Sequence, residues 1–264
     1  ILTGEDDLHV GAGVTLTSTY TNTETHTGAD AVITWTGTHT VTVDGTIIGA
    51  DEAINFAGCL TAQTVIINAG GQLIGGGDGV VEDADGVIFD GAGSTLTNAG
   101  SIHAYGSGIS AMVLDNSTMT ITNSGTMYGR VSGVWHKFGN GTMNFTNTGT
   151  VESPAFSFLG GESVDNVTNS GSMIGTISLG NGNDSYNGRY GTVTGNVLGG
   201  GGDDTFVSGT QAEYFDGGDG LDTVSYASAT VRLVVDLVNG SLTRGALAQG
   251  DTLVSVEGVI GGTK

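Results

Sequence analysis

The chain has 264 residues, of which 27 are acidic and six are basic, so its formal net charge at pH 7 is −21. This charge argues against nucleic-acid binding, which needs a basic surface, and equally against docking on anionic lipid. It favours cations as partners, because a strongly acidic chain repels itself unless counter-ions neutralise it. The alternative is that the acidity only keeps a secreted protein soluble.

The composition indicates a fold that is nearly all β. The chain contains 49 glycines and one proline, β-branched residues are abundant, and no window shows apolar residues at helical spacing. Cys59 is the sole cysteine, so no intramolecular disulfide holds the fold together, and we expect Cys59 to be a small core residue. No apolar stretch of 18 or more residues and no signal peptide is visible. The first residue is Ile1 and not Met, so we expect a processed or excised piece.

Residues 1–44 alternate between Thr and apolar residues in short runs, at 14–20, 31–35 and 39–43. Period-two alternation with Gly, Asn and Asp between the runs is typical of short strands joined by turns. We predict that this segment forms an N-terminal cap or the first, irregular coils.

From Gly45 onward a five-residue segment recurs: Gly, a small or polar residue, an apolar residue, any residue and usually Gly. Its copies lie at 45–49, 71–75, 100–104, 125–129, 149–153, 171–175 and 191–195. Self-similarity at 20–30 residues signals a solenoid, in which each coil pairs only with its neighbours. The sequence therefore predicts a parallel β-helix over residues 45–178.

Two side-chain ladders should run along this β-helix. The apolar residues of the repeat should stack inward: Ile47, Leu73, Ile102, Met127, Val151, Met173 and Val193. The asparagines of the preceding Asn-x-Gly corners should stack as an amide ladder: Asn68, Asn98, Asn123, Asn147 and Asn169.

A glycine-rich nonapeptide, G-G-x-G-x-D-x-U-x with U apolar, follows the repeats. It occurs as GGGGDDTFV at 199–207, as LGNGNDSYN at 179–187 and as GGDGLDTVS at 217–225. Glycines allow the positive φ of a tight turn, and the aspartate supplies the hard oxygen that suits calcium. The predicted calcium-site residues are Gly180, Gly182, Asp184, Gly199, Gly200, Gly201, Gly202, Asp204, Gly217, Gly218, Asp219, Gly220 and Asp222.

The three aspartates are 20 and 18 residues apart, about two nonapeptides, which is one turn of a two-sided roll. We therefore expect the loops to stack on one side, with about two calcium ions between coils, bound by the aspartates and loop carbonyls. Asn181, Asn183, Asp203 and Asp219 either assist or are simply solvated. The alternative is a set of glycine-rich hairpins without metal, but three stacked carboxylates would then repel one another at a strand spacing of ~4.8 Å.

Residues 179–225 resemble the RTX (repeats-in-toxin) calcium-binding β-roll family. The segments 226–237 and 250–262 look like those that follow such repeats, although Val256-Glu257-Gly258 stands where the family usually has Ile-Glu-Asn. The resemblance implies an extracellular protein of a Gram-negative bacterium, exported by type I secretion, with an RTX calcium β-roll at 179–225 and a C-terminal RTX-associated cap at 226–264. The coils before it are similar to repeats of bacterial surface β-solenoids. Proteases, lipases, adhesins, surface-layer proteins and polysaccharide-modifying enzymes all carry RTX repeats, so the family does not fix the activity.

Two further stretches bear on function. The acidic segment 75–90 contains Asp78, Glu82, Asp83, Asp85 and Asp90 without the nonapeptide spacing, and forms either a further calcium site or an exposed loop. Arg130, Trp135, His136 and Lys137 cluster cations with an aromatic ring, a combination that suits a saccharide with a carboxylate.

No nucleophile elbow, zinc-protease helix or cofactor loop is present. We interpret the chain as a non-enzymatic, extracellular, calcium-stabilised β-solenoid with a structural or adhesive role, such as a surface layer, filament or adhesin, that associates with copies of itself. The alternative is a polysaccharide-binding β-helix, or one that modifies polysaccharide as a lyase or epimerase.

Overall fold

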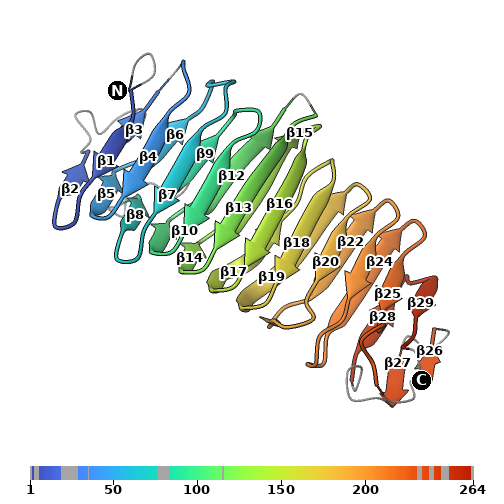
Figure 1. Ribbon diagram of the computed structural model, residues 1–264. Helices are drawn as coiled ribbons and strands as arrows, with labels where there is room; N and C mark the ends of the chain where they lie inside the picture. Colours follow the sequence, from blue (N-terminus) through green and yellow to red (C-terminus); the bar gives the residue numbers. More distant parts are fainter. Residues whose placement is uncertain are drawn as a thin grey trace.

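The computed structural model describes residues 2, 6–18, 29–34, 36–76, 84–114, 116–230, 234–237, 241–244 and 250–262. In this part of the chain the regular structure consists of strands, which wind into one elongated parallel β-helix with the first coils at one end and the last at the other (Figure 1). The predicted fold class is thereby confirmed. A search of the same residues finds no helix long and apolar enough to cross a membrane.

The first face of the β-helix is an eleven-stranded, all-parallel sheet. Its strands, in order, are β1 (Leu8–Val10), β4 (Thr40–Val43), β7 (Thr64–Ile67), β10 (Thr95–Asn98), β13 (Thr118–Asn123), β16 (Thr142–Asn147), β18 (Asp165–Asn169), β20 (Ser185–Asn187), β23 (Thr205–Val207), β25 (Thr223–Ser225) and β29 (Gly258–Ile260). Parallel pairing begins at β1 and β4, so coiling is already established within residues 8–43.

The other two faces share long strands. The second face contains β2 (Thr15–Thr17), β5 (Thr46–Gly49), β8 (Gln72–Gly75), β11 (Ser101–Ala104), β14 (Thr126–Gly129), β17 (Thr150–Leu159), β19 (Ser172–Asn181) and β21 (Thr192–Val193). The third contains β3 (Val32–Ile33), β6 (Ile54–Phe56), β9 (Val87–Phe89), β12 (Ser107–Val113), β15 (Ser132–Gly139), the second halves of β17 and β19, β22 (Val197–Gly201), β24 (Tyr214–Asp219) and β28 (Thr252–Val254).

The cross-section changes along the axis. β17 bends between the two faces where its register shifts between Glu152 and Phe156, next to the sole proline, Pro154. After β21 the second face ends, and each coil then consists of one strand of the first face and one of the third (Figure 1). A three-faced β-helix therefore continues into a two-sided roll, and the glycine-rich loops begin one coil before this change.

The predicted inward ladder is confirmed along its whole length. Consecutive members are register partners, from Ile47 with Leu73 to Met173 with Val193, and Leu16 adds one more at the N-terminal end. All are buried apart from Leu16 and Val193, which are half-buried. Cys59 is also buried, as expected.

The amide ladder is confirmed for four of its five predicted members. The Nδ2 of Asn98 donates to the Oδ1 of Asn123 at 2.7 Å, Asn123 donates likewise to Asn147 at 2.8 Å, and Asn147 to Asn169 at 2.9 Å. The prediction for Asn68 is wrong. The turn that follows β7 contains two more residues than the equivalent turn after β10, so Ile67 takes the ladder position opposite Asn98.

We predict that Asn123→Ala lowers the free energy of unfolding by about 2–4 kcal/mol, because it removes a hydrogen bond from the buried amides of both Asn98 and Asn147. Asn68→Ala is the matched control: Asn68 is exposed and donates only to Asp44 in the described contacts, so the expected loss is below about 1 kcal/mol. Thermal and denaturant unfolding measure both. Equal losses would contradict a stabilising amide ladder.

The C-terminal segment adds one more coil. β28 pairs in parallel with β24, and β29 pairs in parallel with β25. Two antiparallel strands, β26 (Val234–Asp236) and β27 (Ser241–Arg244), lie beside β28.

Candidate metal centre

The three glycine-rich loops stack in register on one side of the roll. Gly180 pairs with Gly200, and Gly200 with Gly218. In each loop two glycines, two residues apart, take positive φ, from 99° to 146°. Residues with a Cβ rarely adopt this backbone, so the spacing of the glycines fixes the shape of the loop.

The aspartates of these loops form a buried column. The Oδ1 of Asp204 accepts a hydrogen bond from the backbone amide of Asp184, and the Oδ1 of Asp222 accepts one from the amide of Asp204, both at 2.8 Å. The Oδ1 of Asp184 accepts in the same way from the amide of Asp165. All three carboxylates are at most 2 % exposed. We call the series Asp165, Asp184, Asp204, Asp222 and Glu257 the carboxylate column, since Glu257 accepts from the amide of Asp222 at 2.9 Å.

In each of the three buried aspartates, the second carboxylate oxygen lacks a hydrogen-bond partner among the described residues. The Oδ2 atoms of Asp184, Asp204 and Asp222 are buried and make no hydrogen bond within the described residues. Burial raises the pKa of Asp184 to about 8 and that of Asp204 to about 6, and it also raises the pKa of Asp222. Charged oxygens without compensation in such a place are costly, so the column needs either protons or a cation.

The surrounding atoms fit a hard cation. A Cβ at Gly199 would collide with both the Oδ2 of Asp204 and the carbonyl oxygen of Gly217, so oxygens of two successive coils converge at the space that glycine leaves open. Carboxylate and carbonyl oxygens are the donor set of calcium, whereas zinc prefers sulfur and nitrogen. Asp204 and Gly217 would hold the ion here.

The polar residues on the rim of the loops have other partners. Asn183 accepts from the amide of Asp203 at 2.9 Å, and Asp203 accepts from the amide of Leu221 at 2.9 Å. Asn181 donates to Glu162, and Asp219 is exposed. These side chains link neighbouring loops at the solvent edge.

A fourth aspartate loop, which the sequence analysis missed, precedes the predicted three and lacks their positive-φ glycines. Residues 160–168 read GGESVDNVT, with a serine in place of the third glycine. Asp165 lies one coil before Asp184 and is fully buried. A Cβ at Gly160 would collide with the Oδ2 of Asp165 and the carbonyl oxygen of Leu179, which repeats the arrangement at Gly199. Allowing serine at the third glycine of the motif would have found this loop.

His136 closes the N-terminal end of the carboxylate column. Its Nδ1 lies 2.8 Å from the Oδ1 of Asp165, the position that a backbone amide takes at the next three levels. Both side chains are 0 % exposed. The expectation that His136 contacts a saccharide is therefore wrong, because the side chain points into the core.

We predict that His136→Leu lowers the free energy of unfolding by about 3–5 kcal/mol, since it leaves the buried carboxylate of Asp165 unpaired. The double variant His136→Leu/Asp165→Asn should lose less than the sum of the two single variants, which unfolding measurements can show. Lys137→Ala, an exposed neighbour on the same strand, is the control. Strictly additive losses would contradict the pairing.

Two further acids, Glu213 and Asp251, lie buried at the turn of the roll opposite the glycine loops. The Ser208 hydroxyl lies 2.9 Å from both the Oε2 of Glu213 and the Oδ2 of Asp251, and the Tyr226 hydroxyl donates to Asp251. Because one hydroxyl has one proton, it cannot donate to both acids at once. Burial raises the pKa of Glu213 to about 7, and Asp251 adds to this rise.

This raised pKa predicts a pH dependence. Above pH 4.5 the unfolded state loses the Glu213 proton while the folded state keeps it up to about pH 7, so folding becomes less favourable across this window. Glu213→Gln should therefore gain about 2–3 kcal/mol relative to the wild type between these pH values. Unfolding at a series of pH values and fixed calcium measures this difference. Exposed Glu152→Gln serves as the control, and a pH-independent difference for Glu213→Gln would contradict the prediction.

Other acidic side chains already have partners. Asp30, Asp51 and Glu52 form the one group of three metal-ligating side chains found in the described part of the chain. Burial and the neighbouring Asp30 raise the pKa of Glu52 to about 10, so a proton neutralises part of this group.

Within the acidic segment 75–90, residues 77–83, including Asp78, Glu82 and Asp83, lie outside the described residues. Asp85 accepts from the amide of Ser107 at 2.6 Å, and Asp90 accepts from the amide of Gly58 at 2.7 Å. These two acids therefore bind the backbone of neighbouring segments.

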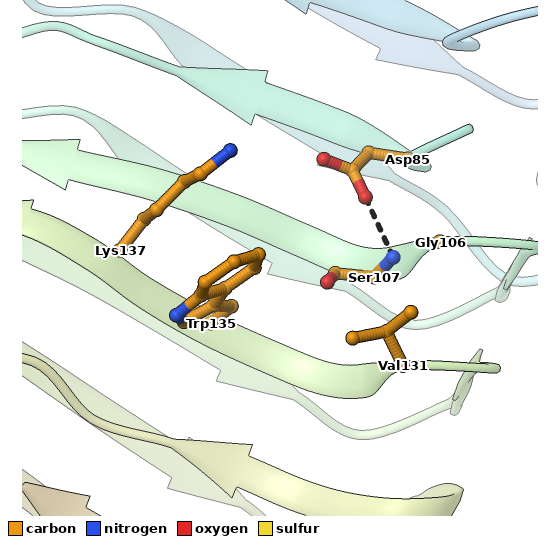
Figure 2. Close-up of a pocket in the computed structure, with 6 residues that line it drawn as sticks. All are labelled: Asp85, Gly106, Ser107, Val131, Trp135 and Lys137. Atoms are coloured by element: carbon orange, nitrogen blue, oxygen red, sulfur yellow. Dashed lines mark hydrogen bonds between the residues drawn. The ribbon is translucent and has the colours of Figure 1, made fainter. Parts of the chain in front are cut away.

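Of the four predicted saccharide contacts, the structure brings Trp135 and Lys137 together. The Lys137 amino group lies 4.8 Å from the centre of the Trp135 ring. A hollow of about 310 Å³ lies beside them, lined also by Asp85, Ser107 and Val131 (Figure 2). A second hollow of about 250 Å³, which Lys137 also lines, is bounded by Ile88, Asp90, Met112 and Phe138, among others. Arg130 is exposed at the turn before β15.

Comparisons with known proteins add no relative: no family model matches the chain, and searches of curated proteins and of solved structures gave no match.

Proposed function

We propose that this chain is a calcium-stabilised structural or adhesive β-solenoid of the extracellular space, in which calcium ions between coils clamp the C-terminal roll. The observation that carries the proposal is the column of buried Oδ2 atoms without partners at Asp184, Asp204 and Asp222. The resemblance of residues 179–225 to RTX repeats supports it independently.

A structural role fits the site better than a catalytic one. The column aspartates are at most 2 % exposed, and the free oxygens of Asp204 and Asp222 lie close to carbonyl oxygens of the next coil, which leaves no room for a substrate. An ion in this position links two coils and removes the repulsion between stacked carboxylates. Because each coil contacts only its neighbours, such links stabilise the roll where it lacks a third face.

The proposed ion supports an extracellular location. Glycine loops with one carboxylate each suit the millimolar calcium outside cells. The net charge of −21 also disfavours association unless cations screen it. We therefore expect calcium to promote association between copies, through the solenoid ends or its flat faces.

Calcium should raise the melting temperature markedly. Two sites filled at 100 times their dissociation constant contribute about 5 kcal/mol, which corresponds to a shift on the order of 10 °C for a chain of this size. Asp204→Asn should reduce this shift, and magnesium should replace calcium poorly because it prefers small octahedral sites. Scanning calorimetry and circular dichroism with calcium, magnesium or a chelator measure these effects.

Exposed Asp203→Asn is the matched control and should respond to calcium like the wild type. If a chelator left the melting temperature and the circular dichroism of the wild type unchanged, the calcium proposal would fail. Particle size and shape by scattering and electron microscopy, with and without calcium, test the association separately.

The hollows beside Lys137 favour a second candidate function, binding of an acidic saccharide. Trp135 offers an apolar ring, Lys137 a cation for a sugar carboxylate, and the hollows have the size of sugar units. This role is compatible with an adhesive solenoid and does not require catalysis.

Trp135→Ala and Lys137→Ala should each weaken binding of a uronate oligosaccharide by about tenfold or more, a loss of about 1.4 kcal/mol. Arg189 and Tyr190 form a similar cation–aromatic pair, 5.0 Å apart, on a separate turn, so Tyr190→Ala is a matched control. Calorimetric titration measures the affinities. Wild-type protein that binds no uronate, or equal affinities in all variants, would rule out this candidate.

A further inference from the structure

The carboxylate column continues past the last glycine loop into the C-terminal coil. The next element after the loop of Asp222 is the short turn 255–257, which joins β28 to β29. Glu257 takes the place of an aspartate here. Its carboxylate accepts a hydrogen bond from the backbone amide of Asp222, just as each aspartate of the column accepts one from the amide of the preceding aspartate. The hydrogen-bond pattern of the column thus extends one level beyond the glycine motif.

An open oxygen site lies at this last level. The Oδ2 of Asp222 is buried, and no hydrogen-bond partner for it occurs in the described part of the chain. A Cβ at Gly217 would collide with this atom and with the carbonyl oxygen of Ser255. The same arrangement occurs one coil earlier at Gly199, where the two oxygens are the Oδ2 of Asp204 and the carbonyl oxygen of Gly217. The Ser255 carbonyl thus corresponds to the Gly217 carbonyl.

The turn itself is shaped to present this carbonyl. Ser255 has φ of 49°, and Asn116 is the other non-glycine residue with positive φ in the described chain. A serine adopts this conformation only where its surroundings hold it there. Three residues separate Val254 from Gly258, whereas six separate their register partners Asp216 and Thr223 in the glycine loop. This shorter connection contains both the Ser255 carbonyl and the Glu257 carboxylate, which lie next to the loop of Asp222.

We propose that a calcium ion bound by the Oδ2 of Asp222 and the carbonyl oxygen of Ser255, next to the Glu257 carboxylate, fastens the C-terminal coil to the last glycine loop. This inference rests on the proposed calcium-stabilised roll and adds a site whose ligands come from outside the glycine motif. Docking of residues 250–262 then depends on the ion.

The pairing around the site explains why the ion matters. β28 and β29 each pair with the roll through three residues. Asp222 and Glu257 place two carboxylates at the same junction, because the Glu257 carboxylate accepts a hydrogen bond from the amide of Asp222. Without an ion, repulsion between these carboxylates opposes short strand pairings. With an ion, the same two acids hold the coil in place.

Hydrogen exchange followed by mass spectrometry of the whole chain tests the site. Calcium should slow exchange at 252–260 by about tenfold or more in the wild type.

Asp222→Asn keeps the acceptor for the Asp204 amide but removes the anionic Oδ2, so it should abolish this protection while calcium still protects residues 179–187. Asp184→Asn, the same change two levels earlier, should leave protection of 252–260 intact. Glu257→Gln should weaken the calcium effect at 252–260 without removing it.

Each outcome separates the new site from the proposed function. If calcium protects the glycine loops but residues 252–260 exchange equally with and without it, the new site is wrong and the calcium roll stands. If Asp222→Asn and Asp184→Asn lose protection at 252–260 alike, the coil responds to overall folding and the new site is also wrong. If calcium protects neither region, the proposed function itself fails.

Discussion

When identical polar side chains stack inside a solenoid, the hydrogen-bonding groups of each one need partners on the next coil. The C-terminal part of this structure depends on which groups supply those partners. An amide has both a donor and an acceptor, so Asn98, Asn123, Asn147 and Asn169 form a chain of hydrogen bonds among themselves. A carboxylate has only acceptors. Backbone amides satisfy one oxygen of each aspartate, and the other oxygen stays open at Asp184, Asp204 and Asp222.

The carboxylate column begins with Asp165 and Asp184, shortly before the second face of the β-helix ends at β21. Three-faced coils enclose aliphatic and aromatic side chains from three faces, whereas the coils after β21 have two faces and enclose less. Fewer apolar contacts per coil leave a larger share of the stability to the turns. The loops of Asp204 and Asp222 lie in these thinner coils, where an ion linking two turns has most to contribute.

Much of this arrangement could be predicted from the sequence, because successive coils of a solenoid place similar residues at similar spacings. The apolar ladder from Ile47 to Val193 and the register of the three glycine loops follow directly from residue spacing. Asn68 was assigned wrongly because two extra residues in its turn shift the register, and spacing within one repeat does not reveal how that repeat pairs with the next.

Other features depend on contacts between different repeats. His136 and Asp165 are 29 residues apart, and neither has a local pattern that identifies its partner. Glu213 and Asp251 are brought together by the C-terminal coil, beyond the last motif. Ser163 hides the fourth aspartate loop because one glycine of the motif is replaced.

The contact between His136 and Asp165 divides the molecule into two regimes. The amide ladder ends at Asn169, on the same strand as Asp165, and carries its own donors and acceptors, so its corners need no ion. In the coils beyond Asp165, the proposed calcium ions would supply the partners that the open carboxylate oxygens lack. On that proposal, a change in calcium concentration lengthens or shortens the ordered rod from one end only, and the imidazole marks the point at which shortening stops.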